Sequence, residues 1–294
     1  LQIKHPDYLF HLGELYKGIG EYKLSRDYFE KFSRLKIGFD SYRQLKARNE
    51  LKVHGDIVRL IVDTANVDVI NLGDDINTGV AEYYPVWLND SIILYSSLKA
   101  YNVNKDGVIK DESYVVQLYT GHKHDSTWFS GSAIISESLR GISFSDGSFD
   151  ENGDFYFVRQ FENANYQLAK TKLILKESIT EKNKTKYSLR MDSVKSVFKG
   201  QNNDEFNYRN PFVFNLEGKK YLLFSSNILG GRGKMDLWYS ENKDGSWNEP
   251  KNLGAKINSP GDEVGPNYDV NTNRFYFSSN WHYGLGGFDL FEAE

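Results

Sequence analysis

Four carboxylates lie close together in the stretch SDGSFDENGD, which spans residues 145–154. They are Asp146, Asp150, Glu151 and Asp154. A pair of carboxyl groups can hydrolyse a glycosidic bond, one as the acid and the other as the nucleophile or base. In a β-rich fold such a site draws its acids from several strands, whereas these four are clustered in one turn. We therefore expect an exposed acidic turn with no catalytic role.

The stretch YNVNKDGVIKDES has the pattern of a calcium-binding loop. Its candidate ligands are Asn102, Asn104, Asp106 and Glu112, and a glycine provides the sharp turn. The first ligand is an asparagine and the closing acid comes one residue early, so a site of this kind would bind calcium weakly. An Asp-Gly hairpin loop is the alternative. No cofactor other than calcium is suggested.

Histidine and cysteine chemistry is limited in this chain. There are six histidines and no cysteine, which excludes a thiolate nucleophile, a disulfide framework and a cysteine zinc site. His122 and His124 alternate in GHKHDS, but no third ligand for a catalytic zinc lies close in sequence. We expect a histidine pair in a loop. No Ser-His-Asp arrangement, phosphate loop or dinucleotide fingerprint occurs, and we predict that the chain is not an enzyme.

Short strands must position these residues, because apolar and polar residues alternate with a period of two over residues 63–294. Runs such as GDFYFVRQ, KKYLLFSS and NRFYFSS are rich in aromatic and β-branched residues. Asp-Gly, Glu-Gly and Gly-Gly breaks separate them. The chain is 15% aromatic, which also favours strands. The pattern predicts an all-β domain.

Internal repeats organise the strands. LGDDINTGVAEYYP (72–85) and LGAKINSPGDEVGP (253–266) share Leu-Gly, Ile-Asn, Glu and Pro at a spacing of 181 residues. A second correspondence, at a spacing of 53, relates Ser225 to Ser278 and Asp236 to Asp289. A weaker copy begins near residue 140. Repeats built as four-stranded meanders predict a β-propeller.

We recognise four blades, beginning near residues 80, 140, 205 and 260. Five or six blades are an alternative if the chain continues beyond its C-terminus. Closure of the ring by a strand from the VDVINLG segment is a further alternative. The recurring Glu82 and Glu263 are expected to be structural, since residues of unique chemistry need not recur. Trp247, in an Asp-box-like stretch, is expected in the core between blades.

Residues 1–62 are predicted to be helical. Leu9, Leu12 and Tyr16 follow helical spacing, and a second run follows the glycine break at residues 18–20. A third helical run covers roughly residues 40–51. Leu12-Gly13, Gly20 and Phe29 fall where a tetratricopeptide repeat has packing residues. An ordinary helical hairpin is the alternative, and further repeats are expected to precede residue 1.

The motif LGxxIN…E..P, with its aromatic-Ser-Ser-Asn and Gly-Gly-x-Asp elements, resembles the WD-like propeller repeats of TolB-related envelope proteins. With tetratricopeptide-like helices ahead of it, the chain resembles the PorE group of type IX secretion and gliding-motility proteins. That group carries an OmpA-like peptidoglycan-binding domain after the propeller. The resemblance implies a periplasmic scaffold associated with the outer membrane, with peptidoglycan bound only through a domain that this chain lacks.

The leading hypothesis is therefore a non-enzymatic module that binds other cell-envelope proteins. Its contact surface is predicted on the rim loops, at Arg232, Trp281, His282 and Tyr283, since aromatic and arginine residues dominate interface energetics. The alternative is a carbohydrate-binding or glycoside-hydrolase-like propeller. A net charge of −4 gives no basic field for nucleic acid, and no apolar run is long enough to span a membrane.

Overall fold

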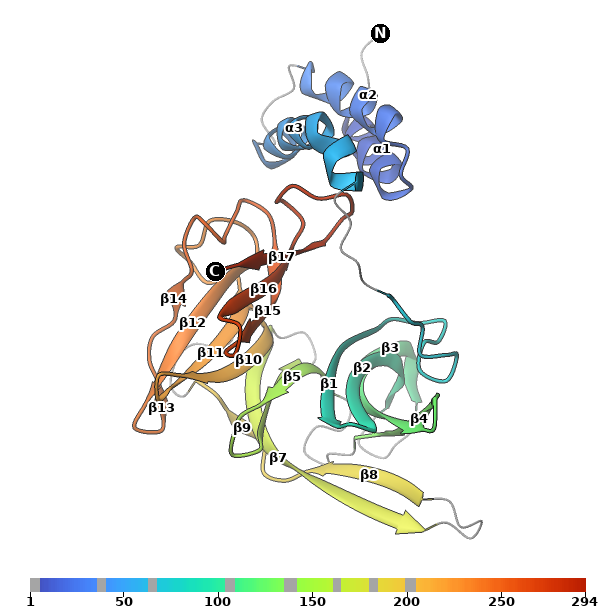
Figure 1. The fold of residues 1–294 in the computed structure, drawn as a ribbon, viewed down its shortest axis with the longest axis vertical. Coiled ribbons are helices and arrows are strands. Elements are labelled where there is room, and N and C mark those ends of the chain that lie inside the picture. The colour runs from blue at the N-terminus through green and yellow to red at the C-terminus, as the bar shows by residue number, and fades with distance from the viewer. Residues whose placement is uncertain are drawn as a thin grey trace.

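The computed structural model describes residues 6–35, 41–62, 68–103, 109–134, 142–160, 165–179, 185–198 and 205–294. Within these ranges the helices all precede the strands (Figure 1). They are α1 (Asp7–Gly18), α2 (Tyr22–Ser33) and α3 (Ser41–Val62). The helical region agrees with the prediction, and α3 extends eleven residues beyond the predicted end of the third run.

The first two helices pack closely because small residues face each other. Ser25 is fully buried, and its hydroxyl donates to the backbone oxygen of Gly13 at 2.8 Å. A Cβ atom at Gly13 would lie 2.8 Å from the ring of Phe29. Only glycine therefore allows α1 to approach Phe29 this closely.

The strands form a four-bladed β-propeller (Figure 1). Every adjacent pair is antiparallel, and the first strands of each blade form a meander in chain order. Blade 1 contains β1 (Glu82–Asn89), β2 (Ile92–Val103), β3 (Ile109–His124) and β4 (Thr127–Ala133). Blade 2 contains β5 (Ser143–Phe149), β6 (Asp154–Gln160), β7 (Tyr166–Ile179), β8 (Thr185–Met191) and β9 (Lys195–Ser196). Blade 3 contains β10 (Tyr208–Leu216), β11 (Lys219–Ser226), β12 (Asp236–Lys243), β13 (Ser246–Trp247) and β14 (Lys251–Asn252). Blade 4 contains β15 (Glu263–Asp269), β16 (Arg274–Ser279) and β17 (Asp289–Ala293). In blades 2 and 3 a last short strand returns to pair with the third strand, β9 with β7 and β14 with β12.

The first strand of each blade lies nearest the axis. Contacts join β1 to β5, β5 to β10 and β10 to β15. The predicted blade starts near residues 80, 140, 205 and 260 agree with these strands to within a few residues.

The core fills the seams between blades. On β6, Phe155 and Phe157 face blade 1, where they pack with Leu94. The alternate residues of the same strand, Tyr156 and Val158, face blade 3. A strand buried on both faces presents apolar side chains at every position, which explains the run FYFV.

Trp247 lies at the seam between blades 2 and 3, with its ring 6.0 Å from that of Tyr156 in an edge-on arrangement. Its predicted structural role is confirmed. Among the described residues, no helix is both long enough and apolar enough to cross a membrane.

Candidate functional site

The blades bring four equivalent residues together near the propeller axis. Each inner strand has a break in its register, and a residue within the break has a positive φ: Tyr84 (51°), Asp146 (46°), Asn210 (52°) and Gly265 (63°). Glycine adopts this conformation freely and Asn and Asp tolerate it, but it is unusual for a residue as bulky as tyrosine. We define the axial cluster as these four residues together with Tyr83 and Arg209.

Asp146 is central to the hydrogen bonds of the axial cluster. Its Oδ2 accepts from the side-chain amide of Asn210 at 2.8 Å and from the backbone N–H of Asn210 at 3.3 Å. The N–H of Asp146 donates to the hydroxyl of Ser96 at 3.0 Å. Asn210 Oδ1 accepts from the N–H of Gly265 at 3.3 Å and from the hydroxyl of Ser225 at 3.1 Å. The network therefore joins residues of all the blades.

The carboxyl of Asp146 is fully buried but only partly satisfied. Its Oδ1 has no hydrogen-bond partner among the described residues. Burial raises the pKa of Asp146, and the charge of Arg209 and hydrogen bonds from Ser145 and Asn210 offset only part of this effect. The guanidinium Nε of Arg209 lies 3.8 Å from Oδ2. A buried polar atom without a partner is costly, and in native proteins such atoms are usually satisfied by an ordered water or an ion.

Two tyrosines and an arginine complete the axial cluster. The rings of Tyr83 and Tyr84 are 5.5 Å apart. Burial, followed by the negative charge of Asp146, raises the pKa of Tyr83 to about 12 and also raises the pKa of Tyr84. Arg209 lies over the ring of Tyr166, 4.3 Å from its centroid. The cluster thus combines two protonated phenols, a guanidinium, an amide and a carboxyl, which suits recognition of a ligand rich in hydroxyl groups.

The expectation of one exposed acidic turn is wrong for three of its four carboxylates. Asp146 belongs to the axial cluster, because the irregularity in β5 turns it away from the following turn. Asp150 is buried; it accepts two backbone N–H groups within the turn and pairs with Lys220 at 3.0 Å. Asp154 forms ion pairs with lysines of β7. Of the four, only Glu151 is exposed as expected.

The recurring glutamates are also structural, as predicted. Glu263 accepts from the backbone N–H of Ser259 at 2.8 Å, from the Ser259 hydroxyl, and from the Ser279 hydroxyl at 2.8 Å. Glu82 makes the same three bonds in the equivalent loop, with Thr78 and a serine of β2. Each glutamate thereby stabilises the loop that leads into its blade.

The structure brings the four predicted rim residues together. Arg232, Trp281, His282 and Tyr283 line one hollow of about 260 Å³. Asn49 of α3 lines the same hollow. The helical region therefore forms part of this rim.

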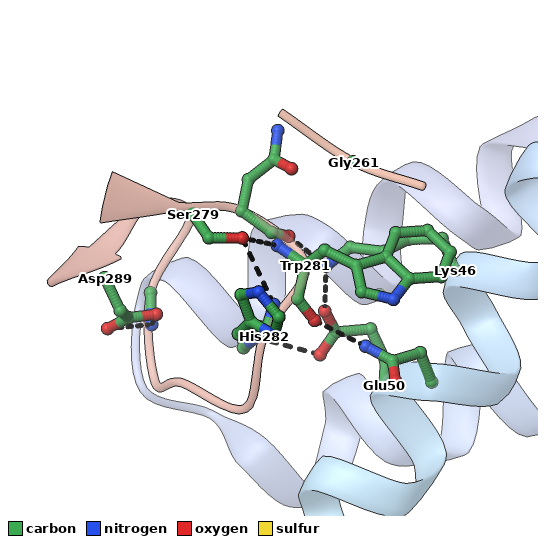
Figure 2. Close-up of polar contacts among 12 residues, drawn as sticks. Lys46, Glu50, Gly261, Ser279, Trp281, His282 and Asp289 are labelled. Carbon is green, nitrogen blue, oxygen red and sulfur yellow. Dashed lines mark hydrogen bonds and ion pairs between the residues drawn. The ribbon is translucent and has the colours of Figure 1, made fainter. Parts of the chain in front are cut away.

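Trp281 already contacts α3 of the same chain. Asn49 donates to the backbone oxygen of Trp281 at 2.6 Å, and the ammonium of Lys46 lies 5.6 Å from the Trp281 ring centroid. Figure 2 shows Lys46 and Glu50 of α3 beside Trp281, with His282 in the adjoining turn. A contact with another protein at these four residues stays a prediction, and Trp281 serves an intramolecular interface.

No metal site is visible in the described part of the chain. Asn104 and Asp106 of the candidate calcium loop lie outside the described residues, as do the side chains of Asn102 and Glu112. The described side chains include no group of three or more metal-binding residues. The Nε2 atom of His122 lies 2.8 Å from the Thr120 hydroxyl, and burial lowers the pKa of His122.

Tyr84, Asn210 and Arg209 are not among the site residues predicted from the sequence. A signal was present, since the axial residue directly precedes the recurring proline at Pro85, Pro211 and Pro266. In blade 2 a glycine replaces that proline, so the proline pattern does not identify Asp146.

No family model matches the sequence, and no curated protein matches it. Solved structures with a similar fold include levansucrase from Bacillus subtilis, 13% identical over 81% of this chain and 75% of the other, with a TM-score of 0.48. A GH43 endo-arabinanase from Bacillus licheniformis is 16% identical over 71% of each chain, with a TM-score of 0.39. A GH43 β-xylosidase/α-arabinofuranosidase from a compost metagenome is 11% identical over 76% of this chain and 77% of the other, with a TM-score of 0.41. At such identities the likeness shows the fold alone.

The predicted function needs correction. The similar structures compared with this chain are glycoside hydrolases and levansucrases rather than WD40-like, tetratricopeptide or secretion proteins. This finding contradicts the predictions of a non-enzymatic scaffold and of a chain that is not an enzyme. The resemblance to PorE-like proteins stays a prediction.

Proposed function

We propose that the protein binds carbohydrate at the axial cluster. The observation that carries the proposal is the gathering of the partly exposed Arg209 guanidinium and the half-buried Tyr83 and Tyr84 phenols around the Asp146 carboxyl. Sugar hydroxyls both donate and accept, so they can satisfy a carboxyl, an amide and a guanidinium at once. The rings of Tyr83 and Tyr84, which lie edge-on to each other, supply the apolar surface that such ligands also need.

Glycoside hydrolysis is the second candidate. The raised pKa of Asp146 favours it, because a general acid must hold its proton near the working pH. Hydrolysis also uses a second carboxyl. At the equivalent axial positions the described residues are Tyr84, Asn210 and Gly265, so a second acid would have to come from elsewhere on the rim or from the substrate.

Binding and turnover of defined glycans test the proposal. Calorimetry would be run with arabinan, xylan and levan oligosaccharides, and reducing-sugar release would be followed in parallel. We expect at least one glycan to bind, and Asp146→Ala to weaken binding by at least about tenfold, or ~1.4 kcal/mol. The control is Asp90→Asn, in an exposed turn of blade 1. Equal affinity of Asp146→Ala and the control, or no binding to any glycan, contradicts the proposal.

Hydrolysis has its own readout. If Asp146 acts as the acid, Asp146→Asn abolishes sugar release and leaves affinity within a few-fold, because the amide keeps most hydrogen bonds. Binding without sugar release in the wild-type chain excludes the second candidate and leaves the first.

Location and partners are proposed on the sequence resemblance. They are a periplasmic position associated with the outer membrane, contact with other cell-envelope proteins, and no nucleic-acid partner. Fractionation of cells that express the tagged full-length protein tests the location. Recovery in the cytoplasmic fraction contradicts it.

A further inference from the structure

The outer edge of β17 is unpaired among the described residues. In the other blades the third strand pairs with a further strand, whereas the sheet of blade 4 ends at β17. Leu290 on β17 is 72% exposed. Its equivalent in blade 3, Leu237, lies 53 residues earlier and is 0% exposed. Strands β12 and β17 are therefore equivalent in the repeat, but only β12 is covered by a further strand.

In blade 3, β14 and the loop after it cover Leu237. The strand pairs place Trp238 opposite Asn252 and Tyr239 opposite Lys251. The N–H of Leu253 donates to the oxygen of Leu237 at 3.0 Å. The side-chain amide of Asn252 also donates to the carboxylate of Asp236 at 2.9 Å.

Asn258 then holds the backbone of Leu237 at both polar groups. Its Oδ1 accepts from the Leu237 N–H at 2.7 Å, and its Nδ2 donates to the Leu237 oxygen at 2.9 Å. Asn258 is 1% exposed. One asparagine thus fixes the start of blade 4 to the third strand of blade 3.

The same loop exists ahead of blade 1, already folded. The Gly73 N–H donates to Asn71 Oδ1 at 2.8 Å, as the Gly254 N–H does to Asn252 Oδ1 at 2.8 Å. The Asn77 N–H donates to the Gly73 oxygen at 2.8 Å, matching the bond between Asn258 and Gly254. Glu82 closes the loop with the bonds that Glu263 makes. Residues 71–82 therefore have the conformation that holds a neighbouring strand in blade 3.

This loop holds no strand in the structure. Asn77 Oδ1 accepts only from Leu72 of its own loop, at 3.1 Å, among the described residues. Val69 and Ile70, which precede the loop, are 94% and 79% exposed. Exposure of these two apolar residues, and of Leu290 on an unpaired strand edge, is unfavourable. Contact between them would remove this apolar surface from water.

We propose that residues 69–72 add to the outer edge of β17 and close the ring. The spacings of 181 and 53 residues fix the register: Ile70 lies opposite Glu292, and Asn71 lies opposite Phe291. Asn77 then holds both backbone polar groups of Leu290, as Asn258 holds Leu237. The side chain of Asn71 donates to Asp289, as that of Asn252 does to Asp236.

The occupant is this chain's own segment, because the loop continues directly into β1. On β1, Tyr84 already lies beside blade 4, where a Cβ atom at Gly265 would be 3.5 Å from its ring. A segment tethered this close has a high effective concentration at its site. A second copy of the chain offers the same segment only at its solution concentration.

Disulfide trapping tests the register, and the native chain has no cysteine to interfere. Ile70→Cys with Glu292→Cys places the thiols at opposed positions, within the ~4.4–6.8 Å between Cα atoms that a disulfide spans. The matched control pairs Ile70→Cys with Leu290→Cys, two residues out of register. We expect the first pair to form an intramolecular disulfide roughly tenfold faster than the control. Equal rates, or no monomeric cross-link, overturn the proposal.

Hydrogen exchange of the unmodified chain gives a readout that needs no variant. We expect the amides of Leu72 and Leu290 to exchange about a hundredfold more slowly than those of an open loop. Asn77→Ala should remove this protection, whereas Asn71→Ala should reduce it by less. Exchange of Leu290 at the rate of an open edge overturns the proposal. Cross-linked dimers in place of monomers would assign the edge to a second copy and also overturn it. Neither measurement depends on carbohydrate binding.

Discussion

At the scale of single residues, burial and the neighbouring polar groups have opposite effects on the Asp146 carboxyl of the axial cluster. Asp146 accepts two hydrogen bonds from Asn210 through one oxygen and leaves the other oxygen without a described partner. Arg209 is close enough to attract the carboxylate but not to hydrogen-bond it. Burial therefore dominates, and the carboxyl is costly to ionise in the folded protein.

This cost gives a pH-dependent stability. The folded pKa of Asp146 is above its ordinary value of 3.8. Stability from this group is thus present at low pH and is lost as the pH rises through the folded pKa. We expect Asp146→Asn to be more stable than the wild type by ~1 kcal/mol at pH 8, because an amide carries no charge that burial would penalise. The difference should shrink toward pH 4. Urea unfolding at both pH values measures it, and a difference independent of pH contradicts the assignment.

A second residue-scale prediction concerns Glu50 in α3. It lies between two buried lysines, 2.8 Å from Lys17 and 2.6 Å from Lys46. Burial raises the pKa of Glu50, but the lysines outweigh burial and lower it on balance. Stability from this ion-pair group is therefore present above the ordinary value of 4.5 and is lost as the pH falls through the folded pKa.

Removing that charge leaves two buried cations without a counter-charge. We expect Glu50→Gln to destabilise the helical region by ~3 kcal/mol, measured by thermal unfolding followed by circular dichroism. Glu30→Gln, on a more exposed ion pair of α2, should cost less than ~1 kcal/mol. Similar losses for the two variants would show that the buried charge is unimportant.

At the scale of elements, the inner strands combine a regular ladder with one irregular position. On β5 the break falls between Ser145 and Gly147. A Cβ atom at Gly147 would overlap the ring of Phe155 and lie 2.7 Å from the backbone oxygen of Tyr156. The strand can therefore turn Asp146 toward the axis only with glycine beside it.

We accordingly expect Gly147→Ala to lower the free energy of unfolding by ~2 kcal/mol, since a backbone atom must move to admit the methyl group. Gly287→Ala is the control, because a Cβ atom there meets nothing within 4 Å. Denaturant unfolding measures both variants. An unchanged Gly147→Ala protein would mean that β5 adjusts freely.

The elements were more predictable from sequence than the site. Strands such as GDFYFVRQ are evident because burial on both faces requires apolar residues at successive positions. The axial cluster was hidden because its members are far apart in sequence and depend on a backbone irregularity that side-chain periodicity does not encode. Asp146 was grouped with its neighbours in sequence, whereas the fold pairs it with Asn210. Trp281 read as an exposed contact because nothing in its loop indicates that α3 covers it.

At the scale of the whole molecule, blade 2 connects the core on both sides. Phe157 packs in the cluster shared with blade 1, and Tyr156 packs in the cluster shared with blade 3. Backbone and side-chain bonds cross the seam between blades 2 and 3, including Val213 N–H to the Ser148 hydroxyl at 3.0 Å. These blades should unfold as one unit.

We expect Phe157→Ala and Phe224→Ala each to cost ~3–5 kcal/mol and to shift one common transition. The two residues belong to different seam clusters. Circular dichroism and tryptophan fluorescence should give coincident curves, because Trp128 reports on blade 1 and Trp238 on blade 3. Separation of the two signals in either variant would show that the blades unfold independently.

The backbone conformation of Tyr84 has a consequence for the stability of the ring. Gly265 adopts the same left-handed conformation in blade 4 without steric cost, whereas tyrosine adopts it at a cost. A chain optimised for thermal robustness alone would carry glycine at both positions. The tyrosine at position 84 therefore carries a backbone strain that a glycine there would avoid.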